Sequence, residues 1–405
     1  MIQEPVDLSH VAAEILAKRD ALLASAARGT PAYAFDRAAF GAALDAFERA
    51  FSRELPGHRA FYAVKSNHHP LVVEEAARRG FGLDVSSGRE LEQALALDGA
   101  PILFSGPAKA PAELERAVLH ADRVTVHLDS FRELERLGDA TTKLGRAITA
   151  GVRVSTERDG AWSKFGVPLD DLARFVRAAR AHPLVDLRGV QFHSSWHRDA
   201  TPFARALEDL ARVIARDLTG EELARLAFVD VGGGYRPHAL EGEFTADESA
   251  GAGRSYRMKP SIPIDAYARA LGDAFRAHLA PLVSARAYTE PGRVVSTHAM
   301  HLLLRVVDKK ADDLVIVDGG VNMVGWEKYL HVACPVVNLT RPSLAEIPVR
   351  IGGSLCDCED VWGFHCFAER IEEGDVLVVP MQGAYGWCVA QSFIRDVPEV
   401  RELDA

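Results

Sequence analysis

A lysine at the end of an apolar run is the first residue of this sequence that could do chemistry. Lys65 follows Phe61-Tyr62-Ala63-Val64 and precedes a break into a helical stretch. Burial disfavours the charged ammonium, so a lysine at the mouth of a buried strand loses its proton more easily than one on a solvated helix. A neutral amine can attack a carbonyl and hold an aldehyde cofactor as a Schiff base. A strand-edge lysine or a buried ion pair is the alternative interpretation.

Three consecutive glycines form a second candidate site. Gly232, Gly233 and Gly234 directly follow the apolar stretch 228–231. Glycines let the backbone approach a ligand closely and direct several N–H groups at one anion. The pattern favours a phosphate site, to which Arg293 could add a charge-assisted contact. A plain tight turn and a surface ion pair of Arg293 fit the same residues.

A histidine and a glutamate at the ends of two predicted strands could face a cofactor ring. His193 could stack on such a ring, although a satisfied core histidine is the commoner case. Glu290, if buried, could pair with a protonated ring nitrogen and keep the heterocycle cationic, which strengthens it as an electron sink. A structural salt bridge is the competing interpretation of Glu290.

A cysteine-rich segment near the C-terminus is a further candidate. Cys356, Cys358, His365 and Cys366 lie close in sequence and suggest zinc, but structural zinc sites usually use paired Cys-x2-4-Cys knuckles. A thiol beside a carboxylate, as in Cys356-Asp357, better suits a proton donor and an amine-binding group, and we expect no metal. Further on, Tyr385 stands between small residues, where its hydroxyl could reach a ligand.

The elements that must position these residues alternate between strand and helix. Between residues 59 and 293, short apolar strands are separated by amphipathic helical stretches, which favours parallel pairing with helical crossovers. Eight such units match the size of a (β/α)8 TIM-type barrel, whose active site lies at the C-terminal ends of its strands. A doubly wound open sheet is the rival fold. The predicted strands end near Lys65, Ser86, Ser105, Asp129, Ser155, His193, Val231 and Glu290.

The pattern changes after residue 293, where strand-like segments are separated by Gly, Pro and Asp turns. We predict strands at 300–308, 314–318, 345–351 and 375–380 in a mostly antiparallel β domain, which the early strand 32–36 is expected to join. The predicted domains are therefore residues 1–36, an N-terminal helix and strand joining the β domain, 37–293, the barrel, and 294–405, the β domain with the Cys-Asp motif. Region 238–260 lacks periodicity and is expected to be a mobile loop at the mouth of the barrel.

Composition narrows the class of protein. A chain of 405 residues exceeds what one core usually supports, and 48% apolar with 26% charged residues is typical of a globular enzyme. The net charge of −10, without a basic run, argues against nucleic-acid binding. The apolar runs are too short to span a membrane. Five cysteines, an odd number clustered late in the chain, do not suggest a disulfide framework, so we expect a reducing, cytoplasmic location.

Seven short motifs occur in an order that resembles a known family, the fold-type III pyridoxal-phosphate decarboxylases. This group contains the eukaryotic-type ornithine decarboxylases and the diaminopimelate decarboxylases, and the resemblance covers roughly residues 30 to 395. The motifs are Tyr-Ala-Val-Lys-x-Asn at 62–67, Asp-Val-x-Ser-x-x-Glu at 84–90, Lys-Phe-Gly at 164–166, Gly-Gly-Gly-Tyr at 232–235, Glu-Pro-Gly-Arg at 290–293, Cys-Asp-x-x-Asp at 356–360 and Ala-Tyr at 384–385.

The resemblance implies a barrel plus a β domain, pyridoxal 5'-phosphate as cofactor, and a head-to-tail homodimer with shared active sites. It also implies removal of the α-carboxylate of an amino acid as carbon dioxide. On the cofactor, Lys65 would form the Schiff base, Glu290 would pair with the pyridinium nitrogen and His193 would stack on the ring. The remaining cofactor contacts implied are Asp84, Ser195, Gly232, Gly233, Gly234, Arg293 and Tyr385.

The Cys-Asp motif would act across the dimer. The resemblance implies that Cys356 reprotonates the substrate carbon after decarboxylation and that Asp357 contacts the substrate, both in the partner's site. Lys164 would pair with Asp360 of the other subunit.

Some residues depart from the family pattern. Members usually carry His-x-Gly-Ser, whereas this chain has His193-Ser194-Ser195-Trp196, so either Ser195 takes over the phosphate contact or the turn alters the site. Diaminopimelate enzymes have Glu after the cysteine and an arginine in the segment corresponding to 318–329. This chain has Asp357 and no arginine there, and Glu327 is a candidate for reading a distal amine.

These departures favour a substrate other than the standard ones. We expect an amino acid or an amino-acid conjugate, such as a citryl-conjugated intermediate of carboxylate siderophore biosynthesis. Basic residues would suit an acidic substrate, namely His197, Arg198, Arg254 and Arg257. The alternatives are a standard ornithine/lysine or diaminopimelate decarboxylase, a related amino-acid racemase, and a non-catalytic decarboxylase-like regulator.

Overall fold

The computed structural model describes residues 8–155, 162–195, 197–238, 242–244, 256–258, 261–325, 332–333 and 335–404. The chain forms two compact units, the first comprising Leu44–Arg236 and Ile262–Val294 and the second Met1–Ala43, Pro237–Ser261 and Val295–Ala405. Among the helices of these described residues, none is both long enough and apolar enough to cross a membrane.

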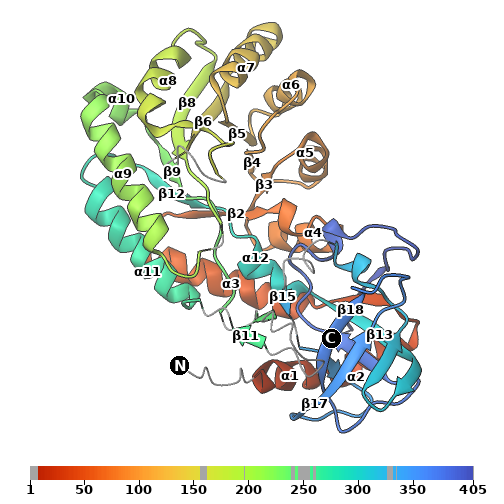
Figure 1. Cartoon of the computed structure of the whole chain (residues 1–405). Coiled ribbons are helices and arrows are strands. Elements are labelled where there is room, and N and C mark those ends of the chain that lie inside the picture. The colour runs from red at the N-terminus through yellow and green to blue at the C-terminus, as the bar shows by residue number, and fades with distance from the viewer. Residues whose placement is uncertain are drawn as a thin grey trace. The chain divides into compact units, whose positions relative to one another are not determined.

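The first unit is a closed parallel barrel, which confirms the predicted (β/α)8 architecture and excludes the open sheet. Each strand pairs in parallel with its neighbours, and the pairing of β5 with β6 closes the ring (Figure 1). A short strand, β7 (Val167–Pro168), extends β6. The eight barrel strands are β2 (Arg59–Ala63), β3 (Gly82–Val85), β4 (Ile102–Phe104), β5 (Val124–Leu128), β6 (Ile148–Ser155), β8 (Val185–Gln191), β9 (Phe228–Asp230) and β12 (Arg286–Thr289).

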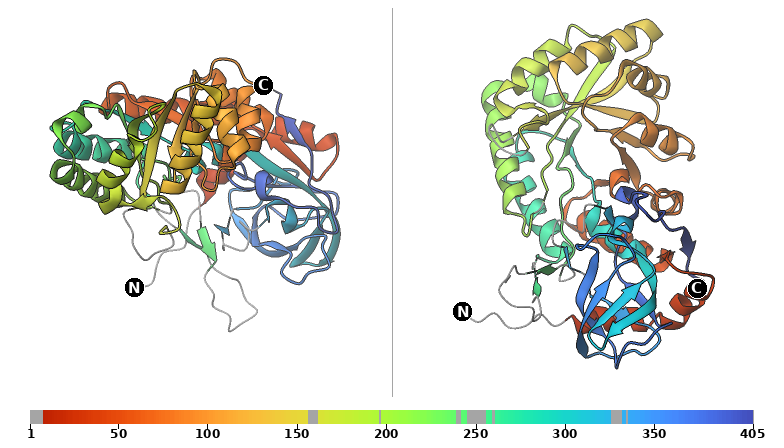
Figure 2. Two further views of the ribbon diagram at one scale, coloured as in Figure 1. Left: turned by 90° about the horizontal axis from the view of Figure 1, so that it is seen from above. Right: turned by 45° about the vertical axis from the view of Figure 1, so that its right-hand side comes forward.

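Helices cover the outside of this ring, as the three views together show (Figures 1 and 2). Residues in and just before the first turn determine where several of these helices begin. Proline stands in the first turn of several helices, where its missing N–H costs nothing, and Ser87 and Ser130 cap two others by accepting a backbone N–H. The helices are α3 (Arg37–Glu54), α4 (Pro70–Arg78), α5 (Gly88–Leu95), α6 (Pro111–Leu119), α7 (Phe131–Leu144), α8 (Leu172–Ala179), α9 (Thr201–Asp217), α10 (Gly220–Ala224) and α11 (Ile264–Ala274).

Aromatic side chains fill the interior of the barrel below the strand ends. Phe228 and Tyr288 stack with ring centroids 4.7 Å apart, and Phe61 lies 5.1 Å from Tyr288. Phe228 fits because β8 presents a glycine to it: a Cβ on Gly189 would lie 2.1 Å from the phenyl ring. Since this layer is apolar, the polar side chains of the barrel interior gather near the C-terminal ends of the strands.

The second unit contains an eight-stranded, mostly antiparallel sheet, as predicted. The early strand β1 (Ala32–Phe35) pairs antiparallel with β13, so it joins this sheet as expected. Helices α1 (Ser9–Leu16) and α2 (Arg19–Ala27) contribute Val11, Ile15 and Leu22 to its core. A short helix, α12 (Arg293–Ser296), follows the barrel. The other strands of the sheet are β13 (Met300–Ala311), β14 (Leu314–Val317), β16 (Val337–Asn338), β17 (Glu346–Gly352), β18 (Val361–Phe367), β19 (Val376–Val379) and β20 (Val400–Glu402).

Region 238–260 is not simply a loop, which corrects the sequence expectation for two of its segments. Strand β10 (Gly242–Phe244) pairs antiparallel with β11 (Tyr256–Met258) and with β15 (Val332–Ala333). These strands group with the second unit rather than with the barrel. The strands are only two or three residues long, too short for an alternating pattern to be recognised in the sequence.

Candidate active site

Lys65 lies where the sequence placed it, in a 3-10 turn directly after β2. Its Nζ is 3.4 Å from Oδ2 of Asp84, at the end of the neighbouring strand β3. The Lys65 side chain retains 34% of its exposure, so it is less desolvated than the sequence argument assumed. An ionised carboxylate at this distance favours the ammonium form of an amine.

Asp84 is fully buried and has two further polar neighbours. Burial and, to a smaller extent, the negative charge of Glu290 raise the pKa of Asp84, whereas Lys65 and the Ser105 hydroxyl lower it, and together these effects place the pKa at about 7. Ser105, at the end of β4, donates a short hydrogen bond to Oδ1 of Asp84. The carboxyl group thus changes charge near neutral pH beside the reactive lysine.

Glu290 follows β12 and is 1% exposed. Its oxygens are 3.1 Å from Nε2 of Gln191 and 3.1 Å from Nδ1 of His193. Burial alone would raise the pKa of Glu290, but the hydrogen bond from His193 and the charge of Lys65 outweigh it and lower the pKa. Burial lowers the pKa of His193 to about 4, so the imidazole is neutral at neutral pH beside an ionised acid. An acid held ionised in this way can pair with a cationic ring nitrogen.

The three glycines form a tight turn after β9 in which side chains have no room. Gly232 and Gly234 have φ angles of +70° and +94°, and a Cβ on Gly234 would lie 2.2 Å from the Ser194 carbonyl oxygen. The Gly232 N–H donates to Oδ1 of Asp230 at 2.8 Å. The Gly233 nitrogen lies 3.0 Å from Nδ1 of His193, the ring nitrogen that donates to Glu290. The turn therefore packs against both His193 and the strand end that carries Glu290.

The remaining predicted barrel residues lie on the adjoining segments. The hydroxyl of Ser195 is 3.3 Å from Nε2 of His193. Arg293 is half-buried and begins α12. Trp196 lies outside the described residues.

Sequence reasoning missed several polar residues of the barrel interior. Asp230 and His127 are both fully buried, their nearest oxygen and nitrogen are 3.9 Å apart, and neither His127 ring nitrogen has a hydrogen-bond partner within the described part of the chain. Arg153, on β6, is 6% exposed and lies over the Phe165 ring at 4.3 Å. Trp162 meets His193 edge-on at 5.8 Å. Each is a polar or bulky residue in or after an apolar strand, which is the signal that could have revealed them.

The zinc interpretation gains no support from the described residues. The side chains there that could share an ion are His127, Asp230 and Glu290, whose ligand atoms lie within 4.8 Å of one another. Cys366 is buried in β18, and burial raises the pKa of its thiol, whereas Cys356 and Cys358 are exposed.

Cys356 and Asp357, which are predicted to act across a dimer, belong to the second unit. Cys356 and Asp357 are exposed on the loop that joins β17 to β18. Tyr385 has a φ angle of +57°, an uncommon conformation for a residue with a side chain and one often found at functional sites. Glu327 lies outside the described residues.

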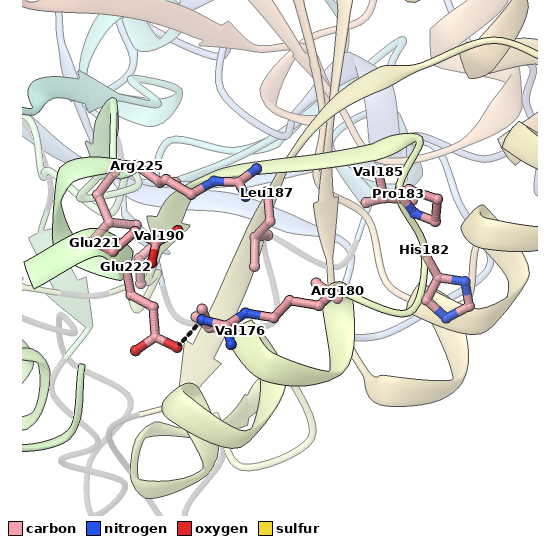
Figure 3. A pocket seen from close by; sticks show the side chains of 13 residues that line it. Val176, Arg180, His182, Pro183, Val185, Leu187, Val190, Glu221, Glu222 and Arg225 are labelled. Atoms are coloured by element: carbon pink, nitrogen blue, oxygen red, sulfur yellow. Dashed lines mark hydrogen bonds and ion pairs between the residues drawn. The ribbon is translucent and has the colours of Figure 1, made fainter. Parts of the chain in front are cut away.

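A cavity lies apart from these residues, on the outside of the barrel. It measures about 290 Å3 and is lined by residues of α8, β8 and α10 (Figure 3). Three of its charged side chains are already paired, Arg180 with Glu222 at 2.8 Å and Arg225 with Asp186 at 3.0 Å. We therefore place the active site at the strand ends and not in this cavity.

The donor set at the strand ends fits pyridoxal phosphate. A primary amine, a buried ionised acid and a turn of glycines that excludes side chains meet there, and these match the aldehyde, the ring nitrogen and the close approach of a phosphate. Lys65, Glu290 and Gly232–Gly234 would hold the group.

Comparisons with known proteins agree with this fit. Residues 42–297 match the family described as "Pyridoxal-dependent decarboxylase, pyridoxal binding domain". The chain is 31% identical over 413 residues to a diaminopimelate decarboxylase from Pseudomonas aeruginosa, covering 95% of this chain and 90% of the relative. It is 28% identical over 385 residues to that of Neisseria meningitidis serogroup A, covering 90% and 87%. A solved lysine/ornithine decarboxylase from Vibrio vulnificus, in complex with putrescine, superposes with a TM-score of 0.77 at 20% identity, covering 96% and 98%.

Proposed function

The chain belongs to the pyridoxal-dependent decarboxylases, and we propose that it removes the α-carboxylate of a diamino acid in the manner of diaminopimelate decarboxylase. That it is a pyridoxal-phosphate-dependent amino-acid decarboxylase, a carboxy-lyase, follows from its relatives. The observation that carries the assignment in this chain is the meeting of Lys65, Asp84 and Glu290 at the ends of three adjacent strands.

Each barrel residue has a distinct part in this proposal. When bound, the cofactor supplies an electron sink for the bond that breaks at the substrate α-carbon. Lys65 would hold the cofactor through its side-chain amine. Asp84 takes up or releases a proton beside that amine near neutral pH. Glu290 would stay ionised and hold a proton on the ring nitrogen, while His193 would face the ring and the glycine turn would bind the phosphate with Arg293.

The second unit supplies the proton donor. Cys356 and Asp357 are exposed, and we propose that they serve the site of a second subunit in a head-to-tail homodimer. Cys356 would deliver a proton to the α-carbon after carbon dioxide leaves, and Asp357 would contact the distal group of the substrate. A reducing, cytoplasmic setting would keep this thiol available.

A second substrate class remains a candidate because of two sequence features. Asp357 replaces the glutamate that diaminopimelate enzymes carry, and residues 318–329 contain no arginine. A conjugated amino acid, such as a citryl derivative from siderophore biosynthesis, would need a different reader for its distal group. Of the basic residues suggested for this, Arg198 is exposed, Arg254 lies outside the described residues and the side chain of Arg257 is not described.

Cofactor binding is the first experiment. Purified protein reconstituted with pyridoxal phosphate should show an absorbance band near the visible edge that borohydride removes, and Lys65→Ala should lack it. Absence of the band from the parent protein would leave only a non-catalytic role. Racemised substrate without gas evolution would instead identify a racemase.

Substrate choice is tested by carbon dioxide release from meso-diaminopimelate, lysine, ornithine and citryl-conjugated diamino acids. We expect the highest kcat/KM with diaminopimelate. A preference for a citryl conjugate would overturn the proposed substrate while keeping the reaction. Cys356→Ala should slow amine formation or divert it toward transamination, and an unchanged rate and product ratio would remove Cys356 from the reaction.

A further inference from the structure

The loop that carries Cys356 and Asp357 is closed by one buried carboxylate. Asp360, at the end of this loop, is 4% exposed. Its Oδ2 accepts the N–H of Leu355 at 2.7 Å, and its own N–H donates to the Asp357 carbonyl at 3.2 Å. The side chain therefore folds back into the loop and fixes the residue directly before Cys356.

A glycine makes room for this arrangement. A Cβ on Gly353 would lie 2.3 Å from both carboxylate oxygens of Asp360, closer than real Cβ contacts come. The Gly353 N–H donates to the Asp360 carbonyl at 2.8 Å, which joins the two ends of the loop. Together these contacts make Gly353–Asp360 a closed ring of backbone with the carboxylate inside it.

The same carboxylate reaches a second segment. Oδ1 of Asp360 accepts the N–H of Val321 at 2.8 Å, and Val321 begins the 3-10 turn Val321–Met323. Two further contacts join the loop and its flank to this region: the Ser354 hydroxyl donates to the Asp318 carbonyl at 3.1 Å, and Trp362 Nε1 donates to the Gly319 carbonyl at 2.8 Å. The loop and segment 318–323 thus form one hydrogen-bonded body.

We propose that Asp360 is a positioning residue that presets the Cys356 loop and locks it to segment 318–323. This rests on the proposed function, in which Cys356 acts on the substrate and Asp357 contacts its distal group. A carboxylate that accepts two backbone N–H groups is well suited to the task, because hydrogen bonds to a charged acceptor are shorter and stronger than neutral ones. Thiol and substrate-contacting residues would then keep a fixed spacing.

This assignment adds to the pairing expected for Asp360. The resemblance implied an ion pair with Lys164 of another subunit, and that pairing stays a prediction. Here both oxygens accept backbone N–H groups within the second unit. Lys164 lies over the ring of Phe165 at 4.7 Å, within the barrel unit.

Asp360→Asn tests the lock, because the amide NH2 that replaces one oxygen cannot accept a backbone N–H. The remaining oxygen can still accept one N–H, so hydrogen exchange of either the Leu355 or the Val321 amide should become about tenfold faster or more, as expected for the loss of a bond to a charged group. The amides of the β17–β18 ladder should not change. Glu359→Gln removes the same charge from the exposed neighbour and should leave all of these rates as they are. Unchanged exchange at Leu355 and Val321 in Asp360→Asn would overturn the lock.

Steady-state kinetics test the positioning role. If Asp360 sets the spacing of the thiol and the substrate-contacting residues, Asp360→Asn lowers kcat and raises KM together, each by roughly tenfold. Partial unfolding would lower kcat alone, in proportion to the inactive fraction. Faster exchange with unchanged kinetics would show that Asp360 closes the loop without positioning any reacting group. If the parent protein releases no carbon dioxide from any amino acid tested, the proposed function is overturned. The hydrogen-exchange experiment would still test whether Asp360 holds the loop to segment 318–323.

Two more variants cover the remaining outcomes. If Asp360→Asn does not fold, Gly353→Ala displaces the carboxylate more mildly and should give the same pair of changes at smaller size. Lys164→Met separates the lock from an intersubunit ion pair, since it should leave exchange at Leu355 and Val321 unchanged. Faster exchange at these amides in Lys164→Met would overturn the assignment in favour of the ion pair.

Discussion

Nζ of Lys65 lies 3.4 Å from Oδ2 of Asp84, a carboxylate that is fully shielded from solvent. The two residues come from adjacent strands, so backbone pairing between β2 and β3 fixes their spacing. Because the pKa of Asp84 is about 7, the charge next to the amine changes within the range in which enzymes work. Asp84 therefore makes the reactivity of Lys65 depend on pH.

Asp84→Asn should shift the pH dependence of cofactor attachment. Above neutral pH the ionised Asp84 stabilises the ammonium of Lys65, and the variant lacks this charge. The pH at which half of the protein reacts with pyridoxal phosphate should fall by roughly one unit. This is the smallest shift expected for an opposite charge at this distance, because Lys65 is partly exposed to solvent. Absorbance followed by borohydride trapping measures it. Ser105→Ala removes the hydroxyl that favours the ionised carboxyl and should raise the pKa of Asp84; equal curves for all three proteins would contradict this coupling.

Asp230→Asn should change the pH dependence of stability. Burial raises the pKa of Asp230 well above its usual range, and the charge of Glu290 adds to this. The folded protein keeps a proton that the unfolded chain releases near about pH 4, so the parent protein loses stability as pH rises above that value. Relative to the parent, the variant should gain about 1.4 kcal/mol of unfolding free energy for each pH unit over which Asp230 stays protonated. Urea unfolding at several pH values measures it, with the exposed Asp98→Asn as control; a pH-independent difference would contradict the raised pKa.

Gly234→Ala should strongly destabilise the turn after β9. Its φ of +94° disfavours a side chain, and the new Cβ would lie 2.2 Å from the Ser194 carbonyl oxygen. We expect a loss of about 2 kcal/mol or more and weaker binding of pyridoxal phosphate. Thermal unfolding and cofactor titration measure these effects. Gly220→Ala is the matched control, since its Cβ would meet nothing within 4 Å. Similar losses of stability in both variants would show that the turn after β9 tolerates a side chain no worse than an open position does.

Lys109→Ala should unfold or severely destabilise the barrel, although Lys109 contacts no proposed ligand. Its buried Nζ donates to the carbonyls of Gly106 and His127 and lies 3.0 Å from Oε2 of Glu133. Removing one partner leaves a buried charge unpaired, at a cost of about 3–5 kcal/mol. Lys109→Met combined with Glu133→Leu should recover much of this loss. Unfolding free energies of the three proteins measure these effects. A double variant as unstable as Lys109→Ala would show that the hydrogen bonds to the backbone contribute more to stability than the ion pair does.

The sequence predicted the ends of the barrel strands to within two residues. Lys65, His193 and Glu290 were found because each is a polar residue that interrupts an apolar run, and closure of the ring then brings such ends together. His127 and Arg153 were missed because alternation along a strand shows two faces but not which one points into the barrel.

Other differences have equally local causes. Strand β18 (Val361–Phe367) was overlooked because His365 and Cys366 drew attention as metal ligands, although one lies half-buried and the other buried in the sheet. The buried position of Asp360 depends on N–H groups of Val321 and Leu355, one of them 39 residues away, and no spacing rule relates such groups. Contacts of this kind follow from the completed fold.

The pairing of β2 with β12 joins the first strand of the barrel to the last. Lys65 and Glu290 thus come from neighbouring strands although 225 positions separate them in the chain. During synthesis, a ribosome-bound chain that ends before β12 contains the lysine but not its acidic counterpart. Joining ends so far apart carries a large loop-closure entropy, which only the completed ring can offset. We therefore expect pyridoxal phosphate to bind only after β12 has joined the barrel.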